Sequence, residues 1–233
     1  MTRRNAAEDP KPCTFLDVSF SFRIKICGIT SEEAARSAVE AGVDHLGLVF
    51  CPSPRRVSEE RATVLTRRVP AAWVGVFADT SPDEVARTAS ALGLAAIQLH
   101  GAESPEECRA VRELSGIPVW KAITADRERV EAGYEAAVDA LLLDAGGGGS
   151  GRTLDWARVG ERFPAARRIV PILLAGGLTP ENVARAIDEA RPDGVDASSR
   201  LETSPGVKDS RLVEEFVRRA RDARAAQVAG TAP

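Results

Sequence analysis

The sequence predicts a single α/β domain built as a closed (β/α)8 barrel, or TIM barrel, because short apolar runs alternate with longer amphipathic stretches from residue 24 onward. Eight strand–helix units of about 25 residues would nearly fill a chain of 233 residues. The apolar runs, interpreted as buried parallel strands, are Arg23–Cys27, His45–Phe50, Trp73–Ala78, Ala95–His100, Val119–Ile123, Ala140–Asp144, Ile169–Ala175 and Gly194–Ser198. An open sheet built from the same units is the alternative topology.

Capping residues mark the helices expected between these strands. A Ser or Thr followed three residues later by an acid can satisfy free backbone N–H groups at a helix start. The complete pattern occurs at Thr30/Glu33, Ser81/Glu84 and Ser104/Glu107, and further expected caps are Ser58, Thr179 and Asp209. We expect the barrel to span residues 23–225, between a flexible N-terminal extension, residues 1–22, and a flexible C-terminal tail, residues 226–233.

Charge and composition exclude several classes of partner. The formal net charge is −3 at pH 7, so neither nucleic acid nor an anionic membrane surface is an expected partner. Acidic residues and prolines occupy the place of a secretory apolar core, and charges interrupt every later apolar run, so we expect a cytoplasmic protein. The cysteines form no CxxC pair and no zinc-site spacing with His, so we expect free thiols and no metal site at Cys13, Cys27, Cys51 and Cys108.

Polar residues occur at the carboxyl ends of the expected strands, where the loops of such a barrel gather and active sites form. Because strand side chains alternate between two faces, Lys25 and Cys27 point inward if Ile24 and Ile26 face the helices. The same count directs into the barrel Gln98, His100, Asp144, Asp196 and Ser198. An apolar interior would not select these residues, so they predict a site for chemistry.

The run Lys25-Ile26-Cys27-Gly28-Ile29-Thr30 resembles the motif that ends the first strand of phosphoribosylanthranilate isomerases. The resemblance extends from residue 23 to about residue 216, and the joint order of its segments is far more specific than any single one. Those segments are Gly47–Phe50, Ser53–Arg55, Val74–Phe77, Gln98–Gly101, Leu143–Asp144, Gly148–Gly151, Leu174–Leu178 with Asn182, Gly194–Asp196, Ser198–Ser199, Glu202 and Ser204–Asp209.

The resemblance implies an aldose–ketose rearrangement, with Cys27 as the general base and Asp144 as the general acid. Opening a furanose ring and removing a proton from its C2′ carbon requires one acid and one base, and no redox cofactor or metal. A thiol is mostly protonated at neutral pH, so Cys27 would need a nearby positive charge, for which Lys25 is a candidate. Asp144 must be shielded or hydrogen-bonded to hold a proton.

The implied small-molecule substrate carries a carboxylate and a phosphate. Arg55 matches the family arginine that binds the anthranilate carboxylate, and a guanidinium can bind a carboxylate through two hydrogen bonds. Phosphate is expected on backbone N–H groups and small side chains near Gly149, Gly151, Gly176, Gly177, Ser198 and Ser199. Asp196 binds a ribose hydroxyl or pairs with Lys25, and Gln98 and His100 line the pocket or belong to the core.

One position departs from the family pattern, because Arg200 replaces the glycine that usually follows the two serines. Arginine there either strains the phosphate loop or adds a charge contact. Two other functions remain open: a related aminoaldose isomerase of histidine biosynthesis, whose first-strand base is an aspartate, and a non-catalytic barrel that binds a phosphate ligand. The chain is expected to act without a cofactor, as a monomer or a homodimer.

Overall fold

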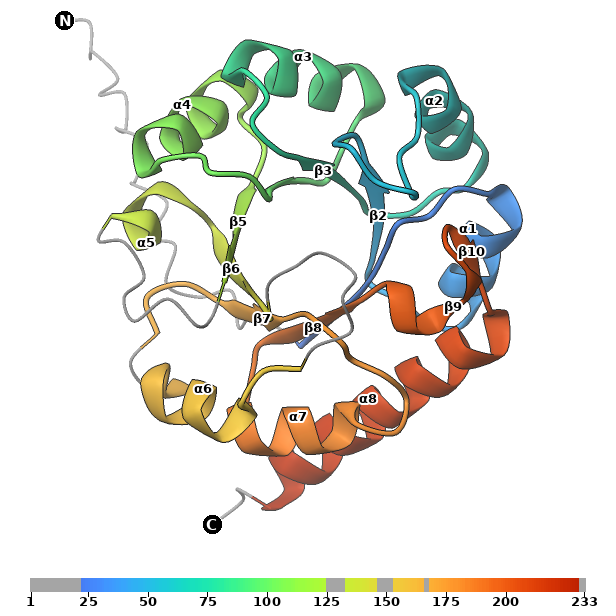
Figure 1. Cartoon of the computed structure of the whole chain (residues 1–233), viewed down its shortest axis with the longest axis vertical. Coiled ribbons are helices and arrows are strands. Elements are labelled where there is room, and N and C mark those ends of the chain that lie inside the picture. Colours follow the sequence, from blue (N-terminus) through green and yellow to red (C-terminus); the bar gives the residue numbers. More distant parts are fainter. Residues whose placement is uncertain (1–21, 125–132, 146–152, 166–167, 231–233) are drawn as a thin grey trace, which may run out of the picture.

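A closed barrel of eight parallel strands forms the centre of the computed structural model, which describes residues 22–124, 133–145, 153–165 and 168–230 (Figure 1). Each strand pairs with its neighbours in chain order, and the last pairs with the first. The predicted barrel is therefore confirmed. Its strands are β1 (Arg23–Cys27), β2 (His45–Val49), β3 (Trp73–Phe77), β4 (Ala96–Leu99), β5 (Val119–Thr124), β6 (Ala140–Asp144), β7 (Ile172–Leu174) and β8 (Gly194–Ala197).

Helices surround the barrel on its outside (Figure 1). They are α1 (Glu32–Glu40), α2 (Glu59–Arg68), α3 (Pro82–Leu92), α4 (Pro105–Ser115), α5 (Tyr134–Ala137), α6 (Trp156–Arg162), α7 (Val183–Ala190) and α8 (Ser210–Gly230). Between β8 and α8 the chain forms a short 3-10 turn, η2 (Ser199–Leu201), and a small hairpin of β9 (Glu202–Ser204) and β10 (Val207–Lys208). Within the described segments, no helix has the length and apolarity needed to cross a bilayer.

Alternation along the strands separates two layers of the core. Ile24 and Ile26 are fully buried in the cluster between the sheet and the helices. Apolar side chains on the other face, such as Val74, Trp120 and Leu142, fill the barrel interior. This arrangement confirms the expected split of β1 into outward isoleucines and an inward Lys25, because parallel strands covered on both faces still alternate by residue.

Strand β7 is shorter than predicted, since it begins at Ile172 and not at Ile169. The Pro171 carbonyl accepts from the Leu141 N–H at 2.9 Å, but Pro171 has no N–H to donate, so the first paired residue of β7 is Ile172. Ile169 is 75% exposed and does not join the core. At the other end of the chain, α8 continues to Gly230, five residues past the expected end of the barrel domain at residue 225.

The capping predictions hold for most helices. Ser58, Ser81 and Ser104 each accept a hydrogen bond from a backbone N–H in the first turn of α2, α3 and α4, and Asp209 does the same for α8. Of these four caps, Ser104 alone forms the reciprocal box, in which the Glu107 carboxylate accepts from the Ser104 N–H at 2.7 Å.

One predicted cap was wrong by one residue. Helix α1 is capped by Ser31, whose hydroxyl accepts from the Ala34 N–H at 3.2 Å, and not by Thr30. The Thr30 hydroxyl instead donates to the Gly206 carbonyl at 2.6 Å, in the β9–β10 hairpin. The cap predicted at Thr179 is present in the turn that leads into α7, where the Thr179 hydroxyl accepts from the Glu181 N–H at 3.2 Å and the Asn182 side-chain oxygen accepts from the Thr179 N–H at 2.8 Å.

His45 is a titratable group in the barrel interior, below the site. Its ring packs edge-on against Trp120, with centroids 5.0 Å apart, and its Nδ1 is buried with no hydrogen-bond partner among the described residues. Burial lowers the pKa of His45 from 6.5 to about 4; Asp44 opposes the shift, whereas Arg23 and Lys25 add to it. The folded protein therefore holds His45 neutral in mildly acidic solution.

We expect the free energy of unfolding to fall as the pH is lowered from 6.5 to 4. In that window the unfolded chain binds a proton on His45 that the folded chain excludes, so acid favours unfolding, by on the order of 3 kcal/mol in total. Urea unfolding at several pH values should show a smaller loss for His45→Asn than for the wild type. Identical pH dependence of the two proteins in this window would contradict the assignment.

Candidate active site

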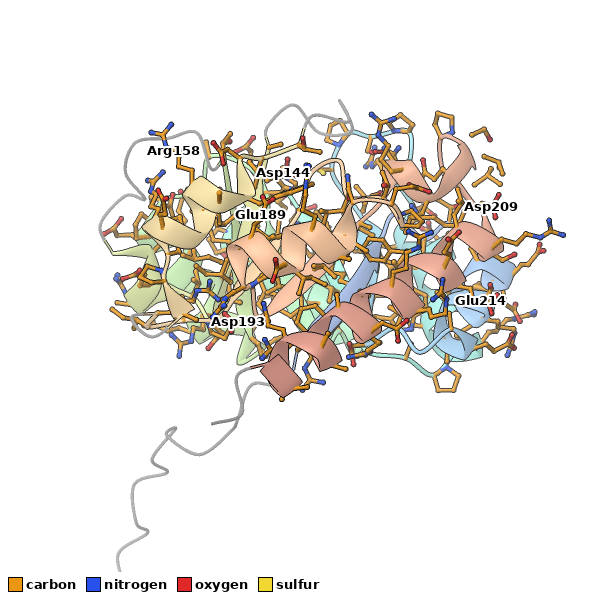
Figure 2. All side chains as sticks on the ribbon, turned by 90° about the horizontal axis from the view of Figure 1, so that it is seen from below. Asp144, Arg158, Glu189, Asp193, Asp209 and Glu214 are labelled. Atoms are coloured by element: carbon orange, nitrogen blue, oxygen red, sulfur yellow. The ribbon has the colours of Figure 1, made fainter. Side chains whose placement is uncertain are left out.

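A pocket of about 580 Å³ opens at the carboxyl ends of the barrel strands. Figure 2, a side view, places Asp144, the last residue of β6, near the upper end of the barrel and Asp193, just before β8, near the lower end. The predicted site residues that line the pocket are Cys27, Arg55, Gln98, His100, Asp144, Gly176, Gly177, Asp196, Ser198 and Ser199. Gly149 and Gly151 lie outside the described residues.

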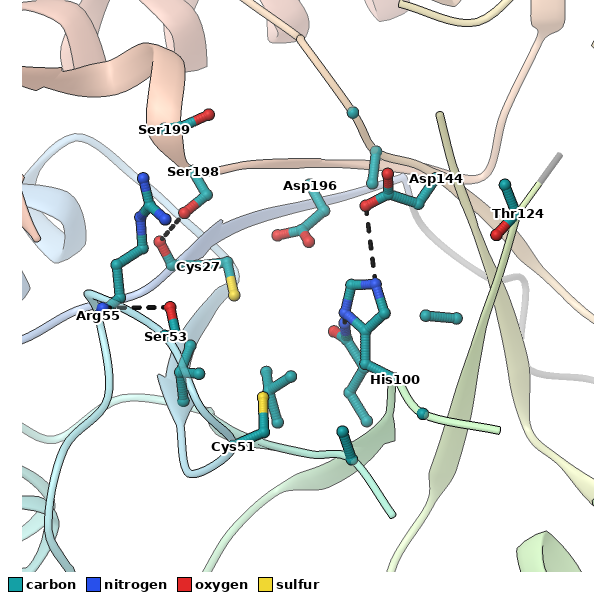
Figure 3. A pocket seen from close by; sticks show the side chains of 18 of the residues that line it. Cys27, Cys51, Ser53, Arg55, His100, Thr124, Asp144, Asp196, Ser198 and Ser199 are labelled. Atoms are coloured by element: carbon teal, nitrogen blue, oxygen red, sulfur yellow. Dashed lines mark hydrogen bonds and ion pairs between the residues drawn. The ribbon is translucent and has the colours of Figure 1, made fainter. Parts of the chain in front are cut away.

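Cys27 ends β1 at one side of this pocket, and Asp144 lies across from it (Figure 3). The thiol is buried, with Cys27 only 9% exposed, and packs beside Val49 and Val76. Gly47 on the adjacent strand makes room for it, since a Cβ there would lie 2.9 Å from the Cys27 sulfur. Gly47 belongs to the family motif in the sequence, and this contact gives it a role that the motif alone did not indicate.

Lys25 lies inside the barrel on the same face of β1 as Cys27. Its ammonium is fully buried and donates to the Asp196 carboxylate on β8 at 2.9 Å. Burial alone would lower the pKa of Lys25, but attraction to Asp196 and to Cys27 outweighs it and raises the pKa, so the ammonium stays charged. Of the two roles left open for Asp196, the structure forms the pairing with Lys25.

Lys25 acts on Cys27 in the expected direction, because it lowers the pKa of the thiol, but it is not sufficient to ionise it. Burial raises the pKa of the Cys27 thiol, and the opposing effects of Lys25 and Lys208 do not cancel it, with Asp196 adding to the increase. The free protein therefore holds Cys27 as a thiol at neutral pH. The loss of water around the sulfur therefore outweighs the attraction of the neighbouring charge.

Asp144 faces His100 across the other half of the pocket (Figure 3). The His100 Nε2 lies 3.8 Å from an Asp144 oxygen, and the Gln98 amide lies 3.4 Å from the His100 Nδ1. Burial lowers the pKa of His100 despite the attraction of Asp144, so the ring is neutral at pH 7. A neutral ring that accepts from Gln98 carries its proton on Nε2, the nitrogen directed at Asp144.

A buried ion pair supports the loop that carries His100. The Glu103 carboxylate accepts from the Lys121 ammonium at 2.8 Å, from the Gly101 N–H at 2.9 Å and from the Asp79 N–H at 2.9 Å. The Tyr134 hydroxyl donates to the Glu103 carbonyl at 2.6 Å. These contacts tie together the ends of β3, β4 and β5, and sequence reasoning identified none of them.

Arg55 is held by two residues that the sequence analysis gave no role. Its Nε and Nη2 donate to the two oxygens of Glu202, at 2.8 and 2.7 Å. Lys208 donates to the same carboxylate at 2.6 Å. The close approach of Arg55 to β1 also requires Gly28, where a Cβ would lie 2.5 Å from the Arg55 Cδ.

The region expected to bind phosphate presents unused backbone donors. Gly176 and Gly177, which follow β7, have positive φ values of 83° and 65°. Backbone that curves around a bound anion often contains residues with positive φ. Among the described residues, no acceptor binds the backbone N–H groups of Gly176, Gly177 or Ser199. The Ser198 hydroxyl, by contrast, donates to the Cys27 carbonyl at 2.9 Å, so it links two strands.

Arg200 lies in η2 and lines the pocket beside these donors. Its φ is not positive, since the described non-glycine residues with positive φ are Asp79 and Arg191. The arginine therefore causes no backbone strain in this loop, and of the two expected effects only the charge contact remains.

In the described segments, no group of three or more His, Cys, Asp or Glu side chains is placed to hold a metal ion. The chemistry that the pocket offers is that of thiols, carboxyl groups, an imidazole, cationic side chains and backbone donors.

Comparisons with known proteins agree with this geometry. The family profile described as N-(5'-phosphoribosyl)anthranilate (PRA) isomerase matches residues 24–219. The isomerase of Desulforudis audaxviator is 44% identical over 86% of this chain and 98% of its own, and that of Rubrobacter xylanophilus is 46% identical over 84% and 97%. The crystal structure of the Thermotoga maritima enzyme is 40% identical with a TM-score of 0.76, over 86% of this chain and 99% of its own. The chain therefore belongs to the N-(5'-phosphoribosyl)anthranilate isomerase family.

Proposed function

We propose that this protein converts N-(5-phosphoribosyl)anthranilate to 1-(o-carboxyphenylamino)-1-deoxyribulose 5-phosphate, an Amadori rearrangement of tryptophan biosynthesis. The observation that carries the proposal is the presence of Cys27 and Asp144 on opposite sides of one pocket (Figure 3). A solved relative bound to the reduced form of this product adds support, at 38% identity and a TM-score of 0.73 over 86% of this chain and 99% of its own.

Asp144 acts in this proposal as the general acid that protonates the furanose ring oxygen while its bond to C1′ breaks. Cys27, once ionised, removes the proton from C2′, and the resulting enolamine becomes the ketone. C2′ is oxidised as C1′ is reduced, so the rearrangement consumes no external oxidant or reductant. His100, held neutral with its Nε2 proton toward Asp144, positions that carboxyl group.

The ends of the substrate are assigned by charge. Arg55 binds the anthranilate carboxylate, and the phosphate binds to the backbone donors of Gly176, Gly177 and Ser199, with Ser198, Gly149 and Gly151 completing the proposed set. Gln98 and Asp196 contact the sugar from the pocket floor, Asp196 through the oxygen that Lys25 does not bind. The aspartate base expected of the histidine-pathway isomerase is absent from the end of β1, where Cys27 stands.

We also propose that the protein works in the cytoplasm as a monomer or a homodimer. Cys27, Cys51 and Cys108 are free thiols, which a reducing compartment preserves. One solved relative is described as a monomeric form of the dimeric Thermotoga maritima isomerase.

Incubation of the purified protein with N-(5-phosphoribosyl)anthranilate should yield the ketose, measured by chromatography. Cys27→Ala and Asp144→Asn should each lower kcat by about 100-fold or more, because each removes one proton-transfer group. Titration with the reduced product analogue should show that both variants still bind. Wild-type protein that binds the analogue without turnover would favour the non-catalytic barrel.

The rate of Cys27 alkylation by iodoacetamide should rise with pH, by about tenfold per unit, up to at least the ordinary thiol pKa of about 8.5. Burial raises the pKa of Cys27, and only the thiolate reacts with the reagent, so alkaline solution increases the reactive fraction. Modification at Cys27 would be followed by mass spectrometry in a Cys51→Ser variant. The kcat/KM of the isomerisation should rise less steeply, because Asp144 must keep its proton while Cys27 loses one. A plateau of the alkylation rate already reached at pH 7 would contradict this assignment.

Replacement of Arg200 by the glycine usual in the family should change mainly KM, by about threefold to tenfold, because Arg200 adds charge at the pocket rim and not a reacting group. Steady-state kinetics at low and high salt would check this, since a charge contact weakens with ionic strength. A large change in kcat at constant KM would argue against it.

A further inference from the structure

The β9–β10 hairpin contributes residues to the site that have no role in the proposed proton transfers. It lies next to α1 and contacts the loop between β1 and α1 through the hydrogen bond from Thr30 to Gly206 (Figure 1). Its two strands carry Glu202 and Lys208, which are paired across the hairpin. Both side chains point away from solvent, at 3% and 1% exposed.

Glu202 is a buried carboxylate shared by two cations. Arg55 donates to both of its oxygens and Lys208 donates to one, at distances of 2.6 to 2.8 Å. Two cations and one carboxylate leave one unit of positive charge in this cluster. The cluster can therefore satisfy Glu202 and still attract an anion.

Some hydrogen-bond donors of Arg55 and Lys208 bind other residues of the protein, and others are left for a ligand in the pocket. Lys208 also donates to the carbonyl and the hydroxyl of Ser198, at 3.2 and 3.3 Å. Arg55 uses Nε and Nη2 for Glu202, and no described residue binds its Nη1. The end of the guanidinium formed by Nη1 and Nη2 is thus available to a second carboxylate, and Arg55 lines the pocket.

The contacts continue from the cluster to the proposed base. Ser198 accepts from Lys208 and donates its own proton to the Cys27 carbonyl at 2.9 Å. Figure 3 shows Arg55, Ser198 and Cys27 together on one side of the pocket, facing His100 and Asp144. A chain of hydrogen bonds therefore fixes the arginine relative to the end of β1.

We propose that Glu202 is a positioning residue, which with Lys208 fixes the Arg55 guanidinium so that its free edge binds the substrate carboxylate. Arg55 has four rotatable side-chain bonds, and a partner that holds one edge removes most of that freedom before the substrate arrives. This inference rests on the proposed function, because it assumes that Arg55 meets the anthranilate carboxylate.

The test compares two substrates, N-(5-phosphoribosyl)anthranilate and N-(5-phosphoribosyl)aniline, which lacks the carboxylate. We expect Glu202→Gln to lower kcat/KM for the anthranilate substrate by about tenfold or more, mostly through KM, since a charged hydrogen-bonded pair holds Arg55. For the aniline substrate the change should stay within about threefold. Arg55→Ala should abolish the preference between the two substrates.

Glu59→Gln is the matched control, because Glu59 also accepts two hydrogen bonds from one arginine, Arg87, but on the exposed surface. It should leave both rates unchanged. If Glu202→Gln fails to fold, Glu202→Asp keeps the charge but shortens the reach, and should show the same selective loss to a smaller degree.

Equal losses on both substrates would reduce Glu202 to a structural residue and overturn the inference. A lower KM of the Glu202→Gln variant for the anthranilate substrate would also overturn the inference, because Glu202 would then compete with the substrate for Arg55. Wild-type protein inactive on the anthranilate substrate would instead overturn the proposed function, and with it the premise of this inference.

Discussion

The ion pair between Lys25 and Asp196 is the interaction on which the rest of this site depends. It joins the first and last strands at the place where the barrel closes, and both partners are buried. A single unpaired charge there would cost several kcal/mol in lost hydration. Each residue therefore requires the other, and together they fix the floor beneath Cys27.

The same constraint recurs around the pocket rim. Glu103 with Lys121 braces the ends of β3, β4 and β5 beneath His100, and Glu202 with Lys208 braces the turn between β8 and α8 beside Arg55. Each pair is almost fully buried, and each also forms hydrogen bonds with the backbone of a neighbouring loop. Local charge pairing thus gives rigidity to loops that an apolar core alone would leave loosely held.

Periodicity was enough to predict the barrel, the inward direction of Lys25 and the position of Cys27 and Asp144 at strand ends, because these depend on local alternation. The partners of Arg55 and Lys121 were not predictable, because Glu202 lies 147 positions from Arg55 and Glu103 lies 18 positions from Lys121, and no local pattern signals either contact. Pro171 could have shown that β7 starts late, because proline cannot donate to a ladder. The pKa of Cys27 required the balance between burial and Lys25, which only three-dimensional packing determines.

The pairing of β8 with β1 also determines when the pocket can form during translation. Lys25, Arg55 and the Cys27 carbonyl receive their partners from residues 196 to 202, and Arg221 of α8 donates to the Phe22 carbonyl at 3.1 Å. A nascent chain that ends before β8 would hold these N-terminal groups without their counterparts. Contacts separated by 171 residues form only after nearly the whole polypeptide has emerged, so the pocket assembles as a late event of synthesis.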